Sequence, residues 1–305
     1  MDLMCIESPH FGKVLRAPSD STILGDRTVM AGMLDLQSRY TVTCDYCRQV
    51  QTEVLPPMRK VLAQWMSEVC EEQSCEDIVF PCAMNYVDRF LARTDVKKSQ
   101  LQLLGAVCLL IASKMRTSRP LALEALVYYT DYSVTAEELK AWELLVLSKL
   151  HWDMASVVAN DFVDHLLCCL GVSGDRDTVR RHANTFISLC ATEYRFTSYS
   201  PSLLASASVA AAIHGLNRPL SCPRNEVVTT LEQITHVEAD QITQCVQDIE
   251  VLMATSFAAF QQPPHSKVNS PSTAYASTKL SSNNVPSTLD SSQPNTPTDV
   301  QDVNF

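Results

Sequence analysis

The most informative stretch of this sequence is residues 101–115, LQLLGAVCLLIASKM. Apart from Gln102, its first dozen residues are apolar or small all round the helical circumference. A helix with no polar face is buried by other helices on every side. We therefore expect a central helix here, whose small residues allow close neighbours: Gly105, Ala106, Ala112 and Ser113.

Amphipathic segments flank this central helix. Pro56 and Pro57 mark a helix start, because a missing N–H does no harm in the first turn, and apolar residues then recur at helical spacing. Thr135 followed by Glu138 is a capping box, which starts another helix. The expected helices of this half are residues 26–37, 56–72, 75–94, 99–115, 120–129 and 135–152, with Ser99 as the N-cap of the central one.

The second half of the chain repeats this order weakly, with residues 200–216, SPSLLASASVAAAIHGL, in the place of the central helix. Two helical segments precede it, and Asn160 is the expected N-cap of the first. The sequence therefore predicts an all-α protein with two tandem five-helix domains and disordered terminal tails. The predicted units are a flexible tail over 1–24, a first domain with a preceding helix over 25–155, a second domain over 156–262 and a disordered tail over 263–305.

Composition argues against several classes of function. A net charge of −10 argues against nucleic-acid binding, which depends on Lys and Arg meeting phosphates. No apolar run is long enough to cross a membrane, and the first residues lack a basic-then-apolar leader, so secretion is not expected. The 12 cysteines are then expected to be free thiols in a reducing compartment. Residues 263–305 are too polar to offset the entropy of ordering.

No catalytic or metal-binding motif stands out in the sequence. Cys44 and Cys47 form a C-x-x-C pair, but a structural zinc site needs a second pair or two histidines at short spacing. His182 and His214 lie in segments whose pattern suggests burial, with no nucleophile or acid at a recognisable spacing. Glycine-rich phosphate loops are missing from this sequence, which has only 7 glycines. We therefore expect no metal, no cofactor and no catalytic centre.

With these helices in place, the sequence resembles the D-type cyclins, a family with two tandem cyclin-box domains. The resemblance implies a regulatory subunit, nuclear and cytoplasmic, that activates a cyclin-dependent kinase of the G1 class. It further implies phosphorylation of a retinoblastoma-type pocket protein and promotion of the G1/S transition. The resemblance covers residues 50–260 and both tips, and is carried by MRKVLAQWMSEVCEEQSCEDIVFPCAMNYVDRFLA (58–92), VKKSQLQLLGAVCLLIASKM (96–115), DFVDHLLCCL (161–170), RRHANTFISLCATEYRF (180–196) and TPTDVQDV (296–303).

Lys114 and Glu143 are the kinase-binding residues that the resemblance implies, a donor and an acceptor presented to one partner helix. From composition alone they are two ordinary solvated charges. The family often carries acidic residues just after this lysine, whereas this sequence reads KMRTSRP, with Arg116, Thr117 and Ser118. Because of this departure, the resemblance does not extend to that part of the contact with the kinase activation segment.

The segment 56–72 carries an apolar stripe over about half of its circumference, more than one core face usually needs. Burial of the whole stripe in the core is one interpretation. The resemblance implies another, a shallow groove that docks Arg-x-Leu-like peptides, including those of kinase inhibitors, with a glutamate that pairs with the peptide arginine. The implied groove residues are Met58, Arg59, Val61, Leu62, Trp65, Glu68, Leu101 and Gln102.

The two tips of the chain carry short peptide motifs. Leu3, Cys5 and Glu7 form an L-x-C-x-E pattern, whose alternate residues share a face in an extended strand. Three fixed residues also occur by chance, but the resemblance implies a peptide that binds the pocket protein. Thr296 lies in the TPTDVQDV tail, where the resemblance implies a phosphothreonine that signals nuclear export and destruction through a ubiquitin ligase.

Two other functions remain open at this point. A transcriptional adaptor built on the same repeat fold requires a basic face to contact DNA, and this chain is acidic. A kinase-independent helical scaffold predicts no role for Lys114 or Glu143.

Overall fold

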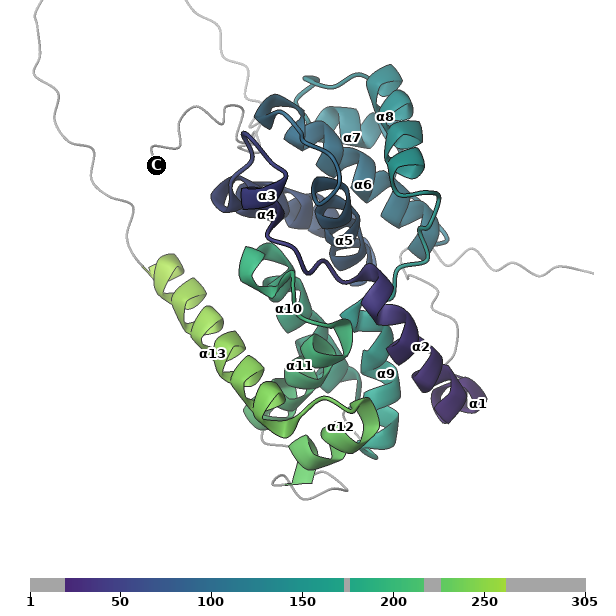
Figure 1. Ribbon diagram of the computed structural model, residues 1–305, viewed down its shortest axis with the longest axis vertical. Coiled ribbons are helices and arrows are strands. Elements are labelled where there is room, and N and C mark those ends of the chain that lie inside the picture. The colour runs from purple at the N-terminus through teal and green to yellow at the C-terminus, as the bar shows by residue number, and fades with distance from the viewer. Residues whose placement is uncertain (1–19, 173–175, 217–225, 262–305) are drawn as a thin grey trace, which may run out of the picture.

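The structure is a computed structural model that describes residues 20–172, 176–216 and 226–261. Two helical bundles are stacked along the long axis of the molecule (Figure 1). Every regular element in the described residues is a helix, which confirms the all-α prediction. The first bundle holds α4 (Pro56–Glu72), α5 (Val79–Leu91), α6 (Leu101–Arg116), α7 (Leu123–Tyr129) and α8 (Ala136–Lys149), and the second holds α9 (Ala159–Cys169), α10 (Arg176–Thr192), α11 (Pro201–Leu216), α12 (Val227–Thr235) and α13 (Ala239–Gln261).

The central helices of the two bundles are α6 and α11, as the apolar pattern predicts. All residues of α6 over 103–113 are buried, and so are all residues of α11 over 205–213. Gly105 lies where α6 packs on α4, and a Cβ atom there would be only 2.7 Å from Leu62 Cδ1. Small residues therefore set how closely these helices approach.

Two predicted N-caps are wrong, and the helices begin differently there. Ser99 lies inside a short 3₁₀ helix, Lys98–Gln100, that leads into α6. Asn160 lies one residue inside α9, and the next residue, Asp161, reaches back to accept the N–H of Val158 at 2.9 Å. A carboxylate at that position satisfies a backbone donor that has no partner within the helix.

The predicted capping box at the start of α8 is confirmed. The Glu138 N–H donates to Thr135 Oγ1 at 3.2 Å, and the Thr135 N–H donates to Glu138 Oε2 at 2.9 Å. This motif involves residues only three positions apart, so the local sequence was enough to predict it.

Three further helices precede the first bundle: α1 (Ser21–Leu24), α2 (Arg27–Tyr40) and α3 (Tyr46–Gln49). Although α2 comes before the first bundle in the chain, it lies along the second (Figure 1) and contacts α9 and α11. Met30 and Tyr40 are buried in the second bundle's core. From residue 20 onward, the described chain thus lies first on the second bundle and then crosses to the first.

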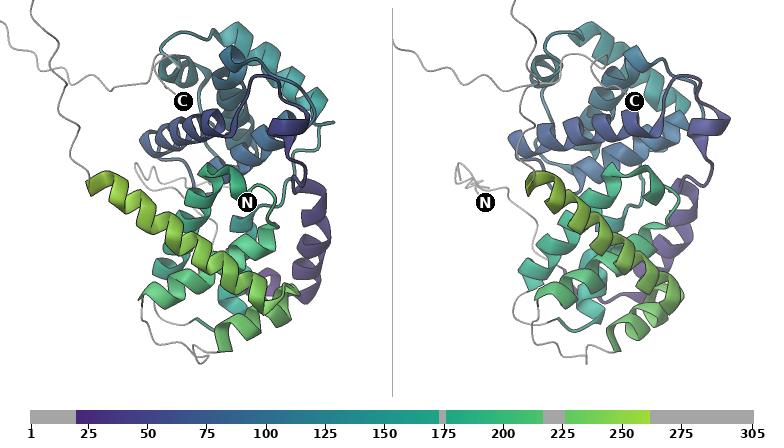
Figure 2. Two further views of the ribbon diagram at one scale, coloured as in Figure 1. Left: turned by 60° about the vertical axis from the view of Figure 1, so that its left-hand side comes forward. Right: turned by 90° about the vertical axis from the view of Figure 1, so that its left-hand side faces the viewer.

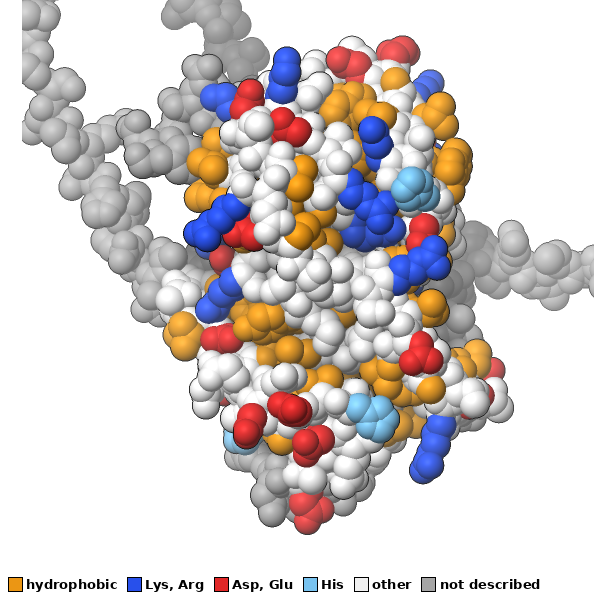
Figure 3. All heavy atoms as spheres, in the orientation of Figure 1, with side chains coloured by type: hydrophobic (Ala, Val, Ile, Leu, Met, Phe, Trp, Pro, Cys, Tyr) orange, Lys and Arg blue, Asp and Glu red, His pale blue; other side chains and the backbone are white. Residues whose placement is uncertain are grey.

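The outer helix α13 runs obliquely across the second bundle, with its C-terminal end towards the first (Figure 2). On the face of Figure 3, the acidic side chains of the second bundle gather around α12.

Over the parts of the chain that the structure describes, no helix combines the length and the apolar character needed to span a membrane.

Candidate functional site

Lys114 and Glu143 come together on the surface of the first bundle. Lys114 lies in the last turn of α6, where a cation complements the helix dipole, and Glu143 lies on α8. Lys114 Nζ is 2.5 Å from Glu143 Oε1, and the two side chains are 46% and 20% exposed. The two charges therefore form one paired feature that remains accessible from outside.

Exposed apolar side chains directly follow both members of this ion pair in the sequence. Met115 follows Lys114 and is 50% exposed, and Leu144 and Leu145 follow Glu143 and are 60% and 38% exposed. Hydrophobic side chains also line the edge of the first bundle that α8 forms (Figure 3). Exposed apolar side chains beside a charged pair are typical of a surface that another protein covers. Sequence reasoning did not single out these three residues, because periodicity alone does not show which faces of α6 and α8 lack a neighbour.

Arg116, part of the KMRTSRP departure, faces the second bundle. Its Nη1 is 3.0 Å from Asp161 Oδ1 and its Nη2 is 3.2 Å from Asp161 Oδ2, and it also donates to the Ser156 carbonyl. Burial alone would lower the pKa of Arg116, but the Asp161 carboxylate holds that pKa above its ordinary value. In this structure Arg116 therefore joins the C-terminal end of α6 to the first turn of α9.

The predicted groove residues lie on α4 and at the start of α6, but they differ in exposure. Glu68 is exposed, and Met58, Val61 and Gln102 are half-buried. The remaining apolar members pack inward and support this face: Leu62, Trp65 and Leu101. The structure thus brings together a partly apolar surface with an exposed carboxylate at its edge.

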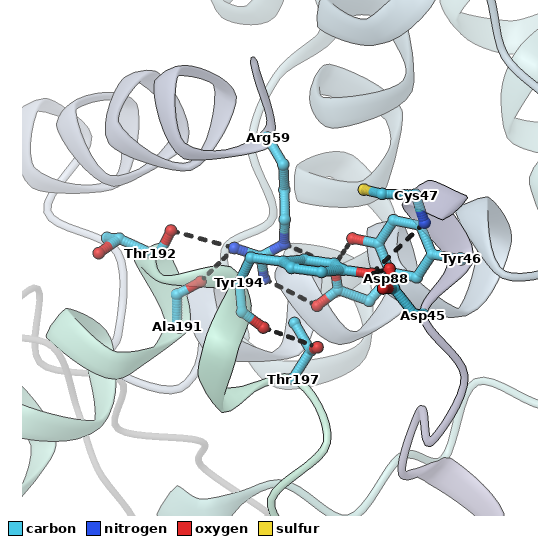
Figure 4. A network of polar contacts seen from close by, with 9 residues as sticks. All are labelled: Asp45, Tyr46, Cys47, Arg59, Asp88, Ala191, Thr192, Tyr194 and Thr197. Atoms are coloured by element: carbon cyan, nitrogen blue, oxygen red, sulfur yellow. Dashed lines mark hydrogen bonds and ion pairs between the residues drawn. The ribbon is translucent and has the colours of Figure 1, made fainter. Parts of the chain in front are cut away.

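Arg59 does not belong to that surface, so its prediction as a groove-lining residue is wrong. Its side chain is 1% exposed and points into the junction between the bundles. Arg59 Nε donates to Asp88 Oδ1 at 2.7 Å, and Nη2 donates to Asp88 Oδ2 at 2.8 Å (Figure 4). Such a bidentate pair is the strongest geometry that a guanidinium and a carboxylate adopt, and it holds Arg59 inside.

The same arginine also binds the second bundle. Arg59 Nη1 donates to the carbonyls of Ala191 and Thr192 at 3.0 and 3.1 Å, where α10 ends (Figure 4). The Tyr46 hydroxyl donates to Asp88 Oδ1 at 2.7 Å. Burial alone would lower the pKa of Arg59, but Asp88 raises it above its ordinary value. The guanidinium therefore remains charged at the centre of the junction.

An aromatic contact extends this junction. The rings of Tyr46 and Tyr194 meet edge to face with centroids 5.1 Å apart, and the Tyr194 hydroxyl donates to Asp45 Oδ1 at 2.9 Å. Lys60 and Glu193 form an outer ion pair of 2.6 Å next to it. Sequence reasoning missed this network, because its members are far apart in the chain.

The remaining predicted sites have different outcomes. Leu3, Cys5, Glu7 and Thr296 lie outside the described residues. His182 and His214 are exposed, so the expectation that they are buried is wrong. In the described segments, no three His, Cys, Asp or Glu side chains lie close enough to hold a metal ion.

Comparison with known proteins identifies the class of this fold. The family described as "Cyclin, N-terminal domain" matches residues 28–155, and "Cyclin, C-terminal domain" matches residues 157–284. The structure resembles a viral cyclin from herpesvirus saimiri with a TM-score of 0.66 and 27% identity, over 75% of this chain and 99% of that one. The two stacked five-helix bundles are therefore those of a cyclin, a regulatory subunit without a catalytic centre.

Full-length relatives define the subfamily. The chain is 44% identical over 306 residues to G1/S-specific cyclin-D3 of Bos taurus, with 100% of both chains covered. It is 43% identical over 311 residues to G1/S-specific cyclin-D2 of Mus musculus, again with 100% of both covered. The chain belongs to the D-type G1/S cyclins, which are non-catalytic regulatory subunits of cyclin-dependent kinases for the G1/S transition.

Proposed function

We propose that this D-type cyclin activates a kinase of the G1 class through the surface around Lys114 and Glu143. The observation that supports this surface most is the accessible ion pair with exposed apolar residues beside it. In an interface the apolar side chains provide most of the affinity, and the charged groups set position and specificity. This surface offers both kinds of group on two packed helices, α6 and α8.

The proposed mechanism is a population shift in the partner. The cyclin packs against the small lobe of the kinase and holds its regulatory helix inward, so that the kinase lysine–glutamate ion pair forms. Higher affinity for that active arrangement then raises its population. All catalytic residues belong to the kinase.

Co-purification with candidate G1-class kinases tests this surface. Lys114→Glu should weaken kinase capture about 30-fold or more, since the loss of a desolvated interfacial charge contact costs about 2 kcal/mol or more. Lys98→Glu is the matched control: Lys98 is exposed and lies before α6, about 24 Å from Lys114 along the helix. It should bind as the wild type does.

A charge swap separates recognition from a merely internal role of the ion pair. Lys114→Glu combined with Glu143→Lys restores the attraction within the chain but reverses both charges that the kinase meets. We expect capture to stay low in the swapped protein. Recovery of wild-type capture by the swap, or equal capture by Lys114→Glu and Lys98→Glu, would refute the proposed contact.

We also propose that the α4–α6 face docks Arg-x-Leu peptides of substrates and kinase inhibitors. Its support is the exposed carboxylate of Glu68 on the same helix as half-buried Met58 and Val61. Fluorescence anisotropy with a labelled Arg-x-Leu peptide tests this assignment. Glu68→Lys should weaken binding, and Glu72→Lys, one turn further along α4, should not. Equal affinities for both variants would exclude Glu68 as the partner of the peptide arginine.

The proposed substrate is a retinoblastoma-type pocket protein, tethered by the L-x-C-x-E tip. An extended peptide of this kind places alternate side chains in a groove of the reader and raises the effective concentration of the substrate. Replacing Leu3, Cys5 and Glu7 together with alanine should weaken pocket-protein binding and leave kinase capture unchanged. Loss of both would assign the tip to another role.

We propose further that phosphorylated Thr296 directs export from the nucleus and ubiquitin-dependent destruction, so that the protein divides between nucleus and cytoplasm. A phosphate adds a charge near −2 and three acceptor oxygens to the tail, which a basic reader recognises. Thr296→Ala should lengthen the protein's half-life and raise its nuclear share. Ser270→Ala, at a Ser-Pro site in the same tail, is the matched control. Equal half-lives for the two variants would contradict the proposal.

A further inference from the structure

Cys70 and Cys75 meet where α4 ends. Beyond Glu72 the chain turns back through Ser74, whose φ of 48° is left-handed. The Cys75 N–H donates to the Cys70 carbonyl at 2.9 Å, and the Ser74 N–H donates to the Glu71 carbonyl at 3.0 Å. These two bonds define a Schellman motif, which brings the side chains at its two ends into contact. Here those two side chains are thiols, so the backbone itself places the two cysteines together.

The two thiols differ in access and in acidity. Cys70 is buried in the core of the first bundle, whereas Cys75 is half-buried against it. A hydrogen bond between the thiols holds the pKa of Cys75 below its ordinary value. The same bond, together with burial, raises the pKa of Cys70. Cys75 is therefore the thiol that ionises first and that solvent reaches.

Five other cysteines in the described part of the chain lack this arrangement. Cys82, Cys108 and Cys190 are buried, and burial raises the pKa of each thiol. Cys168 and Cys169 are neighbours at the end of α9, and consecutive residues of a helix do not face each other. Cys70 and Cys75, by contrast, combine a buried thiol with a half-buried one at the two ends of a single turn.

We propose that Cys70 and Cys75 are a modification site, at which a hydroperoxide converts the two thiols into a reversible intrachain disulfide. A disulfide requires Cα atoms about 4.4–6.8 Å apart, a range that the backbone bond between these two residues favours. In a reducing compartment such bonds are typically transient and redox-sensing rather than structural. This modification site is separate from the proposed kinase-binding surface, which lies on α6 and α8.

The chemistry takes two balanced steps. In the first, the Cys75 thiolate attacks one oxygen of hydrogen peroxide, the O–O bond breaks, and the departing hydroxide takes up a proton and leaves as water. Cys75 becomes a sulfenic acid, oxidised by two electrons. In the second, Cys70 sulfur attacks Cys75 sulfur, the S–O bond breaks, and hydroxide leaves with the Cys70 proton as a second water. Two equivalents of a small thiol reverse the reaction by disulfide exchange.

Peptide mapping of the full-length protein tests the proposal. The reduced protein is exposed to graded hydrogen peroxide, alkylated and cut after glutamate. Because Glu71 and Glu72 lie between the two cysteines, the disulfide joins two separate peptides, 69–71 and 73–76. We expect this linked pair, lighter by two hydrogen atoms than the sum of its parts, and its disappearance after reduction with dithiothreitol.

Two variants separate the two steps, and a third variant serves as the control. Cys70→Ser should stop the reaction at the Cys75 sulfenic acid, which dimedone captures, and Cys75→Ser should leave Cys70 unoxidised. Cys169→Ser, which removes an exposed thiol elsewhere, should leave the linked peptides unchanged. The proposal fails if wild-type Cys70 and Cys75 remain fully alkylated at peroxide concentrations that oxidise Cys169. It also fails if Cys75 pairs with a different cysteine.

Discussion

Removing the Asp88 carboxylate should destabilise this protein more than removing any surface charge. In Asp88→Ala the Arg59 guanidinium remains at the junction of the two bundles, 1% exposed, with two backbone carbonyls but no counterion. Breaking a buried ion pair from one side costs about 3–5 kcal/mol, because an uncompensated buried charge is left behind. Tyr46 loses its acceptor as well. We therefore expect the free energy of unfolding to fall by about 3–5 kcal/mol.

A neighbouring ion pair gives the matched control. Lys60 follows Arg59 on α4 and pairs with Glu193 at 2.6 Å, so it joins almost the same two segments, but its side chain is 46% exposed. Solvent screens such pairs, and their contribution is typically about 1 kcal/mol or less. Lys60→Met should therefore lower the free energy of unfolding by no more than that amount. The contrast between the two variants isolates burial as the cause of the larger loss of stability in Asp88→Ala.

Urea titrations followed by far-ultraviolet circular dichroism measure both variants. A third protein, with Arg59→Met and Asp88→Leu together, removes both charges and should recover much of the loss, since apolar replacements of buried ion pairs are often close to neutral. Our reasoning is refuted if Asp88→Ala unfolds within about 1 kcal/mol of the wild type. A double variant less stable than Asp88→Ala would also contradict it, because the cost would then not come from the unpaired charge.

Three smaller perturbations test the packing and the capping of the first bundle. Gly105→Ala places a Cβ 2.7 Å from Leu62 Cδ1 and should lower the free energy of unfolding by about 1–3 kcal/mol, as measured in thermal melts. An unchanged melting midpoint would mean that Leu62 on α4 moves aside without cost. Thr135→Ala removes the α8 cap and should cost about 0.5–2 kcal/mol, with no loss expected from Ser148→Ala on the exposed side of the same helix. The Thr135 N–H and hydroxyl lower the pKa of Glu138, so this capping contribution is complete above the ordinary value of 4.5 and fades as the pH falls through the lower folded pKa. The stability difference between wild type and Thr135→Ala should accordingly narrow in acid, and a constant difference would contradict the charge-assisted cap.

The parts of the fold that could be predicted are those that depend on neighbouring residues. The central helix α6 was predictable because burial on all sides requires apolar residues at every position, and this is visible in the sequence alone. The capping box of α8 depends on residues three positions apart. Lys114 and Glu143 were predicted through family resemblance, and their 2.5 Å pairing became visible only when α6 and α8 were placed side by side.

The failure at Arg59 and in the network around it has one physical origin, which is contact over long sequence distance. Arg59 lies on a helix whose pattern leaves a charged residue on the outside. Its partners are Asp88, 29 positions away, and the carbonyls of Ala191 and Thr192, 132 and 133 positions away. Asp88 lies on α5, a helix whose residues are mostly apolar apart from Asn85, Asp88 and Arg89, and a carboxylate in such a helix is the signal that could have indicated a buried counterion.

The placement of the two proposed binding surfaces on one helix has a mechanical consequence. Gln102, at the edge of the proposed peptide groove, and Lys114, in the proposed kinase surface, lie near opposite ends of α6. They are twelve positions apart, which corresponds to about 18 Å along the helix. Every residue of the intervening 103–113 stretch is buried, so the helix has no freedom to bend between the two ends. A peptide held at one end is therefore kept at a fixed distance from a kinase held at the other. It follows that occupancy of the groove should raise local substrate concentration without changing the affinity for the kinase.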